Sequence, residues 1–324
     1  MKTMTRRQAL WLAAAAGAAP SLSAMAQATF PSRPLRIVVP FPVGGGTDSV
    51  GRLVAEQLRA ELGQPVVVEN RPGAGTLLGA SQVARSPADG YSLLVATSTT
   101  LAISPAMYPN PAVTRADFAP IAMIGGVTLL LITRPDFPAH SLAELVDEAR
   151  KHPGKYNFAS PGTGTIHHLL FEMLKVQQKV AITHVPYQGS IPALTDVMTG
   201  RVDFMFIDVV AGIQQIKAGN VKLVAVNASQ RLPGFPNVPT LPETYPQLDI
   251  QAWQSIVAPK GTPSAITQRL NAAINRGLAT KAMRDTLASF GVEANPLPID
   301  ALDALIARDA TRFAELVRLL GNIR

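Results

Sequence analysis

The chain of 324 residues contains no cysteine, which excludes disulfide bonds and thiolate metal sites. It also lacks a run of Lys and Arg interleaved with aromatic residues, so a nucleic-acid-binding surface is not expected. Several catalytic motifs are missing: the G-x-S-x-G turn of serine hydrolases, the H-E-x-x-H zinc motif and the lysine of a nucleotide-binding P-loop. These absences leave a binding protein as the simplest functional class.

The first 26 residues are predicted to be a secretory signal peptide. Lys2, Arg6 and Arg7 precede an uncharged run over residues 9–19, and the small-residue sequence AMA follows at 24–26. The start resembles a twin-arginine leader with an alanine where a bulky apolar residue is usual, so the Sec and twin-arginine routes both stay open. A membrane anchor is the alternative, but the apolar run is far shorter than the roughly 20 residues that cross a bilayer. We expect an exported mature protein with 26 Lys and Arg against 22 Asp and Glu, a net charge of +4.

Hydrophobic periodicity predicts an α/β fold. Short apolar runs alternate with amphipathic stretches, which implies parallel strands joined by right-handed helical crossovers. The expected strands are 35–39, 65–69, 92–96, 156–159, 181–185, 202–207, 222–227 and 253–258. The expected helices are 47–62, 76–85, 141–151, 165–176, 191–199 and 209–218, with two more starting at Pro263 and Ile299.

Nearly 300 mature residues exceed what one compact core usually holds, so two lobes are expected. The apolar run 121–133 is long enough to leave one lobe and enter the other, and a proline-dense connector precedes the return. We predict lobe 1 over residues 29–126 plus 254–324 and lobe 2 over 127–253. Two crossings would form a hinge, with ligand between the lobes at the carboxyl ends of the strands.

Two glycine-rich loops follow predicted strands and precede predicted helices: PFPVGGGTD at 40–48 and SPGTGT at 160–165. A joint of this kind directs unpaired N–H groups and the positive end of a helix dipole at one spot, which suits an anion. The alternative is a tight turn in which Thr47 or Asp48 caps the helix. Asp48 would repel an anion unless it is turned to accept N–H groups or to hold water. Opposing loops from the two halves are expected to hold one carboxylate together.

Other polar residues near the predicted strand ends are the hydroxyls at 97–100, Tyr187 and Asp208. Asp208 is equally suited to two roles. It can accept hydrogen bonds from an ammonium or hydroxyl of the ligand, or it can cap the next helix. His168 falls nearly opposite the apolar stripe of its helix, four residues before Glu172, which favours a solvated or capping histidine paired with that glutamate. His167 lies at the edge of the stripe, where packing is expected.

Eight short motifs, in order, resemble the periplasmic solute-binding proteins of tripartite tricarboxylate transporters, the Bug or TctC-like receptors. They are PSRP at 31–34, VPFP and GGGTD within 39–48, VENRPGAG at 68–75, DGY at 89–91, HPGK at 152–155, ASPGTG at 159–164, HVPY at 184–187 and VPT at 238–240. The chain departs from the family pattern at Val43, where proline is usual, at Gly51, at residues 76–77 and at His167. None of these changes removes a backbone donor, so carboxylate binding is expected to survive, but His167 is expected to change the pocket rim and with it the ligand.

The resemblance implies a two-lobed periplasmic binding protein (type II-like, Venus flytrap) with two hinge crossings. It also implies a non-enzymatic receptor, without cofactor or metal, that passes a small organic acid to the large and small membrane subunits of a transporter. A ligand-sensing component of a histidine-kinase system is the alternative, and a monomer is expected. The candidate ligand-binding residues are Phe41, Val43, Gly44, Gly45, Thr47, Asp48, Thr97, Ser98, Thr99, Ser160, Gly162, Thr163, Gly164, Thr165, Tyr187 and Asp208.

Overall fold

The computed structural model describes residues 30–321, so the predicted signal peptide over residues 1–26 lies outside the described residues. The chain divides into two units, residues 1–32 and 33–324, and the fold described below belongs to the second unit. Among residues 30–321, no helix combines the length and the apolar character needed to cross a membrane.

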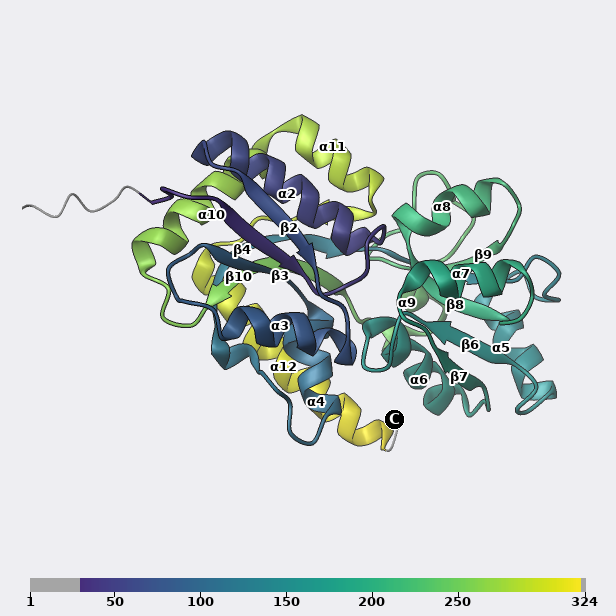
Figure 1. Ribbon diagram of the computed structural model, residues 1–324. Coiled ribbons are helices and arrows are strands. Elements are labelled where there is room, and N and C mark those ends of the chain that lie inside the picture. Colours follow the sequence, from purple (N-terminus) through teal and green to yellow (C-terminus); the bar gives the residue numbers. More distant parts are fainter. Residues whose placement is uncertain (1–29, 322–324) are drawn as a thin grey trace, which may run out of the picture. The chain divides into compact units, whose positions relative to one another are not determined.

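A six-stranded sheet has the strand order β11-β4-β10-β3-β1-β2 (Figure 1). Its strands are β1 (Leu35–Val39), β2 (Val66–Asn70), β3 (Ser92–Thr97), β4 (Phe118–Val127), β10 (Ala252–Pro259) and β11 (Val292–Ala294). Strand β1, next to the edge strand β2, pairs in parallel with β2 and β3, with Val38 opposite both Glu69 and Leu94. This parallel core is what strands separated by helices predict.

Helices cover both faces of the six-stranded sheet (Figure 1). They are α2 (Gly46–Leu62), α10 (Ser264–Ala279) and α11 (Lys281–Ser289) on one face, and α3 (Leu77–Ala84), α4 (Ser104–Met107) and α12 (Ile299–Leu320) on the other. Shorter turns span Ala74–Thr76, Thr99–Ile103 and Arg115–Asp117. Helix α2 ends at Gly63, whose left-handed backbone (φ 69°) is the usual C-terminal stop.

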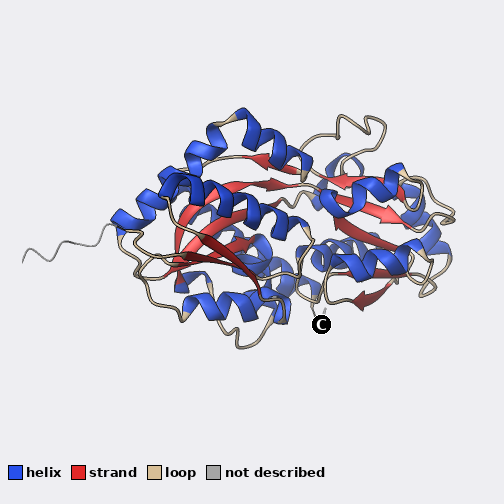
Figure 2. Cartoon of the chain, turned by 45° about the horizontal axis from the view of Figure 1, so that its top comes forward, coloured by secondary structure: helices blue, strands red, loops and turns tan. Residues whose placement is uncertain are grey.

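The second sheet has five strands in the order β7-β6-β8-β5-β9 (Figure 2). Its elements are β5 (Leu129–Thr133), α5 (Leu142–Lys151), β6 (Asn157–Ser160), α6 (Ile166–Gln178), β7 (Thr183–Pro186), α7 (Ser190–Met198), β8 (Phe204–Asp208), α8 (Val209–Lys217), β9 (Lys222–Asn227), α9 (Leu241–Thr244) and the turn Pro246–Leu248. Strand β8 alternates strictly: Met205 and Ile207 join the core under α7 and α8, whereas Phe204 and Phe206 contact Phe171 of α6.

The chain passes between the two sheets twice, from β4 to β5 at Val127–Leu129 and from β9 to β10 across residues 228–251. The predicted α/β fold with two crossings is therefore confirmed. Both sheets are mixed, however, and not parallel throughout. Strand β10 begins at the end of the sheet where β3 finishes, so these two strands run antiparallel. Strand β5 is antiparallel to β8 for the same reason.

Candidate ligand-binding site

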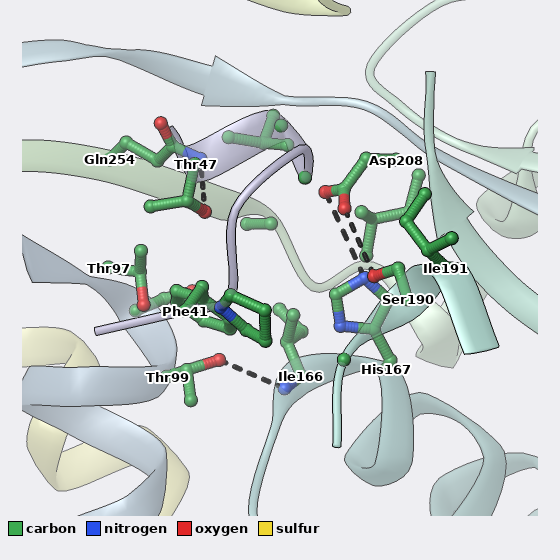
Figure 3. A pocket seen from close by; sticks show the side chains of 18 of the residues that line it. Phe41, Thr47, Thr97, Thr99, Ile166, His167, Ser190, Ile191, Asp208 and Gln254 are labelled. Atoms are coloured by element: carbon green, nitrogen blue, oxygen red, sulfur yellow. Dashed lines mark hydrogen bonds and ion pairs between the residues drawn. The ribbon is translucent and has the colours of Figure 1, made fainter. Parts of the chain in front are cut away.

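A pocket enclosing about 730 Å³, its open mouth included, lies where the carboxyl ends of β3 and β8 meet the start of β10 (Figure 3). Both sheets and the connections between them contribute to its wall. Half of the sixteen candidate residues line it: Phe41, Val43, Gly45, Thr47, Thr97, Ser98, Thr99 and Asp208. Figure 3 shows Asp208, His167 and Ser190 grouped on one side, Thr47 and Gln254 on another, and Phe41 between them. The pocket therefore combines separate polar groups with an apolar centre.

The first glycine-rich loop carries the chain from β1 into the pocket wall. Helix α2 begins at Gly46, and its N-cap Gly45 provides no side-chain hydrogen bond to the first turn. A Cβ built on Gly46 would lie 3.1 Å from the Asp208 Cβ, whereas one built on Gly45 would have no heavy atom within 4 Å. The start of α2 thus faces Asp208 at close range and retains uncapped N–H donors at the pocket.

Asp48, in the first turn of α2, does not line the pocket. Its Oδ2 accepts a hydrogen bond from the Gly44 N–H at 3.0 Å, and its Oδ1 accepts one from Asn70 Nδ2 at 2.9 Å and lies 3.0 Å from Arg52. Burial would raise the pKa of this carboxyl, but the hydrogen bonds from Arg52, Gly44 and Asn70 hold it below its usual range. The carboxylate is therefore turned into the loop, which removes the conflict with a bound anion.

Hydroxyl and amide groups form a second polar area of the wall. The Thr99 hydroxyl accepts a hydrogen bond from the N–H of Ile166, the first residue of α6, at 3.0 Å. Gln254 Nε2 donates to Thr47 Oγ1 at 3.0 Å, while Gln254 Oε1 is buried without a partner among the described residues. The pocket thus presents neutral hydroxyls together with an unused amide oxygen.

His167 reaches the pocket from α6 and meets Asp208 there. Its Nε2 lies 4.0 Å from Asp208 Oδ1, and in the part of the chain that the structure describes neither ring nitrogen has a hydrogen-bond partner. Ser190 donates to Asp208 Oδ2 at 3.4 Å. Burial lowers the pKa of His167, an effect that the Asp208 carboxylate only partly offsets, so the imidazole is neutral at pH 7. Sequence periodicity indicates a packing role for His167, whereas its departure from the family pattern indicates a place at the pocket rim; the structure places it in the pocket wall.

Four helices begin at this pocket. Besides α2, they are α6, α7 and α8, which start at Ile166, Ser190 and Val209. The first turns of α2, α7 and α8 carry no side-chain cap, and Asp208 is the N-cap residue of α8 without capping it. Because helix N-termini carry partial positive charge, their convergence favours an anionic group without any Lys or Arg in the wall.

The second glycine-rich loop faces a neighbouring pocket of about 790 Å³. That pocket includes Gly162, Thr163, Thr165 and Tyr187 and shares Phe41, Pro42 and Gly189 with the first one. Pro40 of the first loop also lines this second pocket, so the start of the first loop and the second loop meet there. The N-cap Gly45 and the start of α2 face the first pocket instead. The remaining candidates, Gly44, Asp48, Ser160 and Gly164, line neither pocket.

Internal hydrogen bonds explain the different behaviour of the second loop. Thr165 Oγ1 accepts from the N–H of His168 at 3.4 Å, and His168 Nδ1 accepts from the N–H of Gly164 at 3.3 Å. Ser160 Oγ accepts from the N–H of Gly162 at 3.2 Å. With the N–H of Ile166 bonded to Thr99, the N–H groups of Gly164, Ile166 and His168 are already used. This loop caps its own helix.

Of the two roles predicted for His168, solvated or capping, the capping role is confirmed by the hydrogen bond from the Gly164 N–H, and the solvated role is wrong. The side chain is 1% exposed, and its Nε2 lies 3.6 Å from Glu172 Oε1, so the predicted pairing holds inside the protein. Lys175 Nζ donates to the same oxygen at 2.7 Å. Burial would raise the pKa of Glu172, but hydrogen bonds from His168 and Lys175 keep it below its usual range. Within residues 30–321, no three His, Asp or Glu side chains gather closely enough to hold a metal ion.

Comparisons with known proteins agree with this architecture. The family described as "Tripartite tricarboxylate transporter family receptor" matches residues 50–321. The protein BugT of Bordetella pertussis is 38% identical over 296 residues, which cover 90% of this chain and 91% of BugT. An R. palustris protein solved with adipate superimposes with a TM-score of 0.86 at 31% identity, over 90% of this chain and 98% of that one. MatC from Rhodopseudomonas palustris, solved with bound malate, superimposes with a TM-score of 0.83 at 34% identity, over 89% and 100% of the two chains. This chain therefore belongs to the tripartite tricarboxylate transporter receptor family of solute-binding proteins and has its two-lobed, Venus-flytrap fold.

Proposed function

We propose that this protein is a periplasmic receptor that captures a small organic acid in the 730 Å³ pocket and delivers it to a tripartite tricarboxylate-type membrane transporter. The observation that carries the proposal is the meeting of helix N-termini without side-chain caps at a pocket that has no Lys or Arg in its wall. The ligands named for two related structures, adipate and malate, are both carboxylates and support the same class.

The carboxylate would lie against the first turn of α2 and the hydroxyls at 97–99. Backbone N–H groups at a helix N-terminus stabilise an anion by about 0.3–1 kcal/mol at an exposed site and up to about 2 kcal/mol in a partly buried one. Several such groups, together with hydroxyl donors, are enough to hold a carboxylate without a full positive charge. Apolar contacts with Phe41 and Ile166 would hold the carbon skeleton.

Closure of the two lobes, here lobe 1 (29–126 plus 254–324) and lobe 2 (127–253), would accompany binding. The contacts that would close on the ligand are the Thr99 hydroxyl with the Ile166 N–H, and Ser104 Oγ, which lies 3.1 Å from the Gly164 carbonyl oxygen and also donates to Gly75. A ligand shifts an open-closed equilibrium only by its differential affinity for the two states, so the closed form must hold contacts that the open form lacks.

The binding claim is tested by calorimetry and thermal shift with a panel of mono-, di- and tricarboxylates at pH 7.5. A ligand present at about 100 times its Kd should stabilise the folded protein by about 2.7 kcal/mol. Small-angle scattering of the same samples should show compaction, and native mass spectrometry should show a monomer and the mass of any retained ligand. If no acid in the panel shows saturable binding, the proposed function is wrong.

Delivery and location require tests in cells. Fractionation should recover the protein in the periplasm, with the first 26 residues missing from its mass. Deletion of the gene should abolish uptake of the acid identified in vitro, and re-expression should restore it. If uptake continues while transcription of a neighbouring kinase-regulated operon no longer responds to the acid, the sensing role replaces the transport role.

A further inference from the structure

The pocket contains more unused acceptors than a carboxylate ligand can employ. Asp208 is 9% exposed, yet its contacts are a 3.4 Å hydrogen bond from Ser190 and a 4.0 Å approach of His167. Gln254 Oε1 is buried without a partner among the described residues, as are both ring nitrogens of His167. Buried polar atoms in folded proteins nearly always have hydrogen-bond partners. A group of unpartnered polar atoms around one cavity therefore indicates that a bound molecule supplies the missing partners.

The charge of the wall is also unbalanced. Asp208 is the only Asp, Glu, Lys or Arg among the residues that line the pocket. His167 does not neutralise it, because burial lowers the pKa of the imidazole and keeps it uncharged at pH 7. A buried carboxylate with weak hydrogen bonds and no counter-ion is costly to maintain unless a cation joins it.

We propose that the ligand is a carboxylic acid that also carries an ammonium group, with the ammonium on Asp208 beside His167 and Ser190 and the carboxylate at the start of α2. This inference rests on the proposed function, since it concerns the same pocket. Gly46 meets the Asp208 side chain at the N-terminus of α2, so the positive helix end and the negative side chain are neighbours. A 2-amino acid carries its two opposite charges on adjacent carbon atoms and matches this pair of sites.

Other small acids fit the same wall less well. A second carboxylate placed near Asp208 would meet a like charge in a partly desolvated pocket, where repulsion is strong. A hydroxyl could donate one hydrogen bond to Asp208 but would leave its charge without a partner. An ammonium group provides three donors as well as the charge, which matches the two oxygens of Asp208 and one nitrogen of His167.

The test compares acids that differ by a single group on the same carbon skeleton. The pairs are butyrate with 2-aminobutyrate, succinate with aspartate, glutarate with glutamate and adipate with 2-aminoadipate, and malate provides the hydroxyl variant of succinate. Titration calorimetry with the full mature protein at pH 7.5 should give at least one pair in which the amino acid binds ten or more times tighter than its unsubstituted partner, and tighter than the hydroxy acid where one exists.

The variant Asp208→Asn should remove this preference, because it keeps the shape and the hydrogen bonds but removes the charge. The amino acid should bind at least tenfold more weakly to the variant, while the unsubstituted acid binds as before or more tightly. Asp249→Asn makes the same charge change at an exposed residue outside the pocket and should leave every affinity within twofold. Circular dichroism verifies that both variants fold.

The outcomes separate the two proposals. If unsubstituted acids bind and every amino counterpart binds equally or more weakly, the ammonium inference is wrong and the receptor proposal stands. If no acid of either kind binds, the proposed function itself fails. The pairwise preference of the unmodified protein decides the inference even if Asp208→Asn does not fold.

Discussion

The two glycine-rich loops of this protein have a similar sequence pattern, but they differ in whether side chains use their backbone N–H donors. Both follow a strand of a parallel core and lead into a helix, α2 or α6. The first loop leaves the start of α2 without a side-chain cap, at the pocket. In the second loop, Thr165 caps α6, and His168 Nδ1 accepts the N–H of Gly164. The comparison teaches that a glycine-rich turn before a helix becomes an anion site only if no neighbouring side chain uses its donors.

The difference depends on single residues at corresponding positions. At the N-cap, the first loop has Gly45, which has no side chain, and the second has Thr165, whose hydroxyl accepts from the N–H of His168. In the first loop the only carboxylate, Asp48, is held by Arg52 and Asn70 away from the pocket. The N–H groups at the start of α2 remain without a side-chain cap because the N-cap residue of the first loop, Gly45, has no side chain.

The largest expected effect comes from giving the first loop a cap like that of the second. Gly45→Asp places a carboxylate where no heavy atom lies within 4 Å of the new Cβ, so the fold should tolerate it. The new side chain would accept the free N–H groups of α2 and repel a bound anion. Carboxylate affinity should fall about 100-fold, on the scale of a lost charge-assisted hydrogen bond of about 1.5–3 kcal/mol, as measured by calorimetry.

Two variants at the same residue make this result specific. Gly45→Ala adds a Cβ without a cap and should change affinity less than about threefold. Gly45→Asn adds a neutral cap and should give an intermediate loss, which separates competition for N–H groups from charge repulsion. Unchanged binding by Gly45→Asp would show that the first loop does not hold the carboxylate.

Local features of this fold were predictable, whereas features that depend on distant segments were not. The strand over residues 35–39 was predicted with the observed bounds and the helix from Ile299 with the observed start, because apolar periodicity and turn residues encode them locally. The antiparallel placement of β10 depends on a chain crossing some 25 residues long, and no local pattern encodes it. The three-residue strand β11 is too short to produce a periodic signal.

The site shows the same division. The sequence of one loop left two interpretations of the start of α2 open, free N–H donors or a cap from Thr47 or Asp48. The inward turn of Asp48 depends also on Asn70 of β2. The meeting of Gly46, His167 and Ser190 at Asp208 depends on how the two sheets pack together, which periodicity does not report. His168 was misplaced because one apolar stripe was assumed for α6; this helix contacts α12 and the turn Pro246–Leu248 as well as its own sheet, so its other face is buried too.

A smaller effect, on the free energy of unfolding, should distinguish the two loops by the packing around them. Gly44 and Gly164 have nearly the same left-handed backbone, φ 89° and 84°. Alanine at either position should cost about 1–2 kcal/mol of strain in the free energy of unfolding. A Cβ at Gly164 would also lie 3.2 Å from Ser104 Oγ, whereas one at Gly44 would have open space. Urea denaturation should therefore show a larger loss for Gly164→Ala than for Gly44→Ala. Equal losses would mean that the packing around the second loop adds no constraint.

The smallest expected effect is a pH dependence that arises beside the second loop, at His184 of β7. Burial, with the neighbouring His168, lowers the pKa of His184 to about 3, and its Nε2 lies 2.7 Å from Ser160 Oγ. A histidine that is neutral when folded but has a pKa of about 6.5 when unfolded contributes stability above pH 6.5. That contribution is lost progressively as the pH falls from about 6.5 toward 3.

Melting temperatures at pH 8, 6 and 5 measure this contribution. His184→Gln keeps a polar partner for Ser160 but does not titrate, so its melting temperature should fall less on acidification than that of the unmodified protein, by at most a few degrees because His184 is partly exposed to solvent. His140→Gln removes an exposed histidine and should leave the acid sensitivity unchanged. If the melting temperatures of the His184 and His140 variants fall equally on acidification, His184 does not make the second loop sensitive to pH, and the difference between the two loops reduces to capping alone.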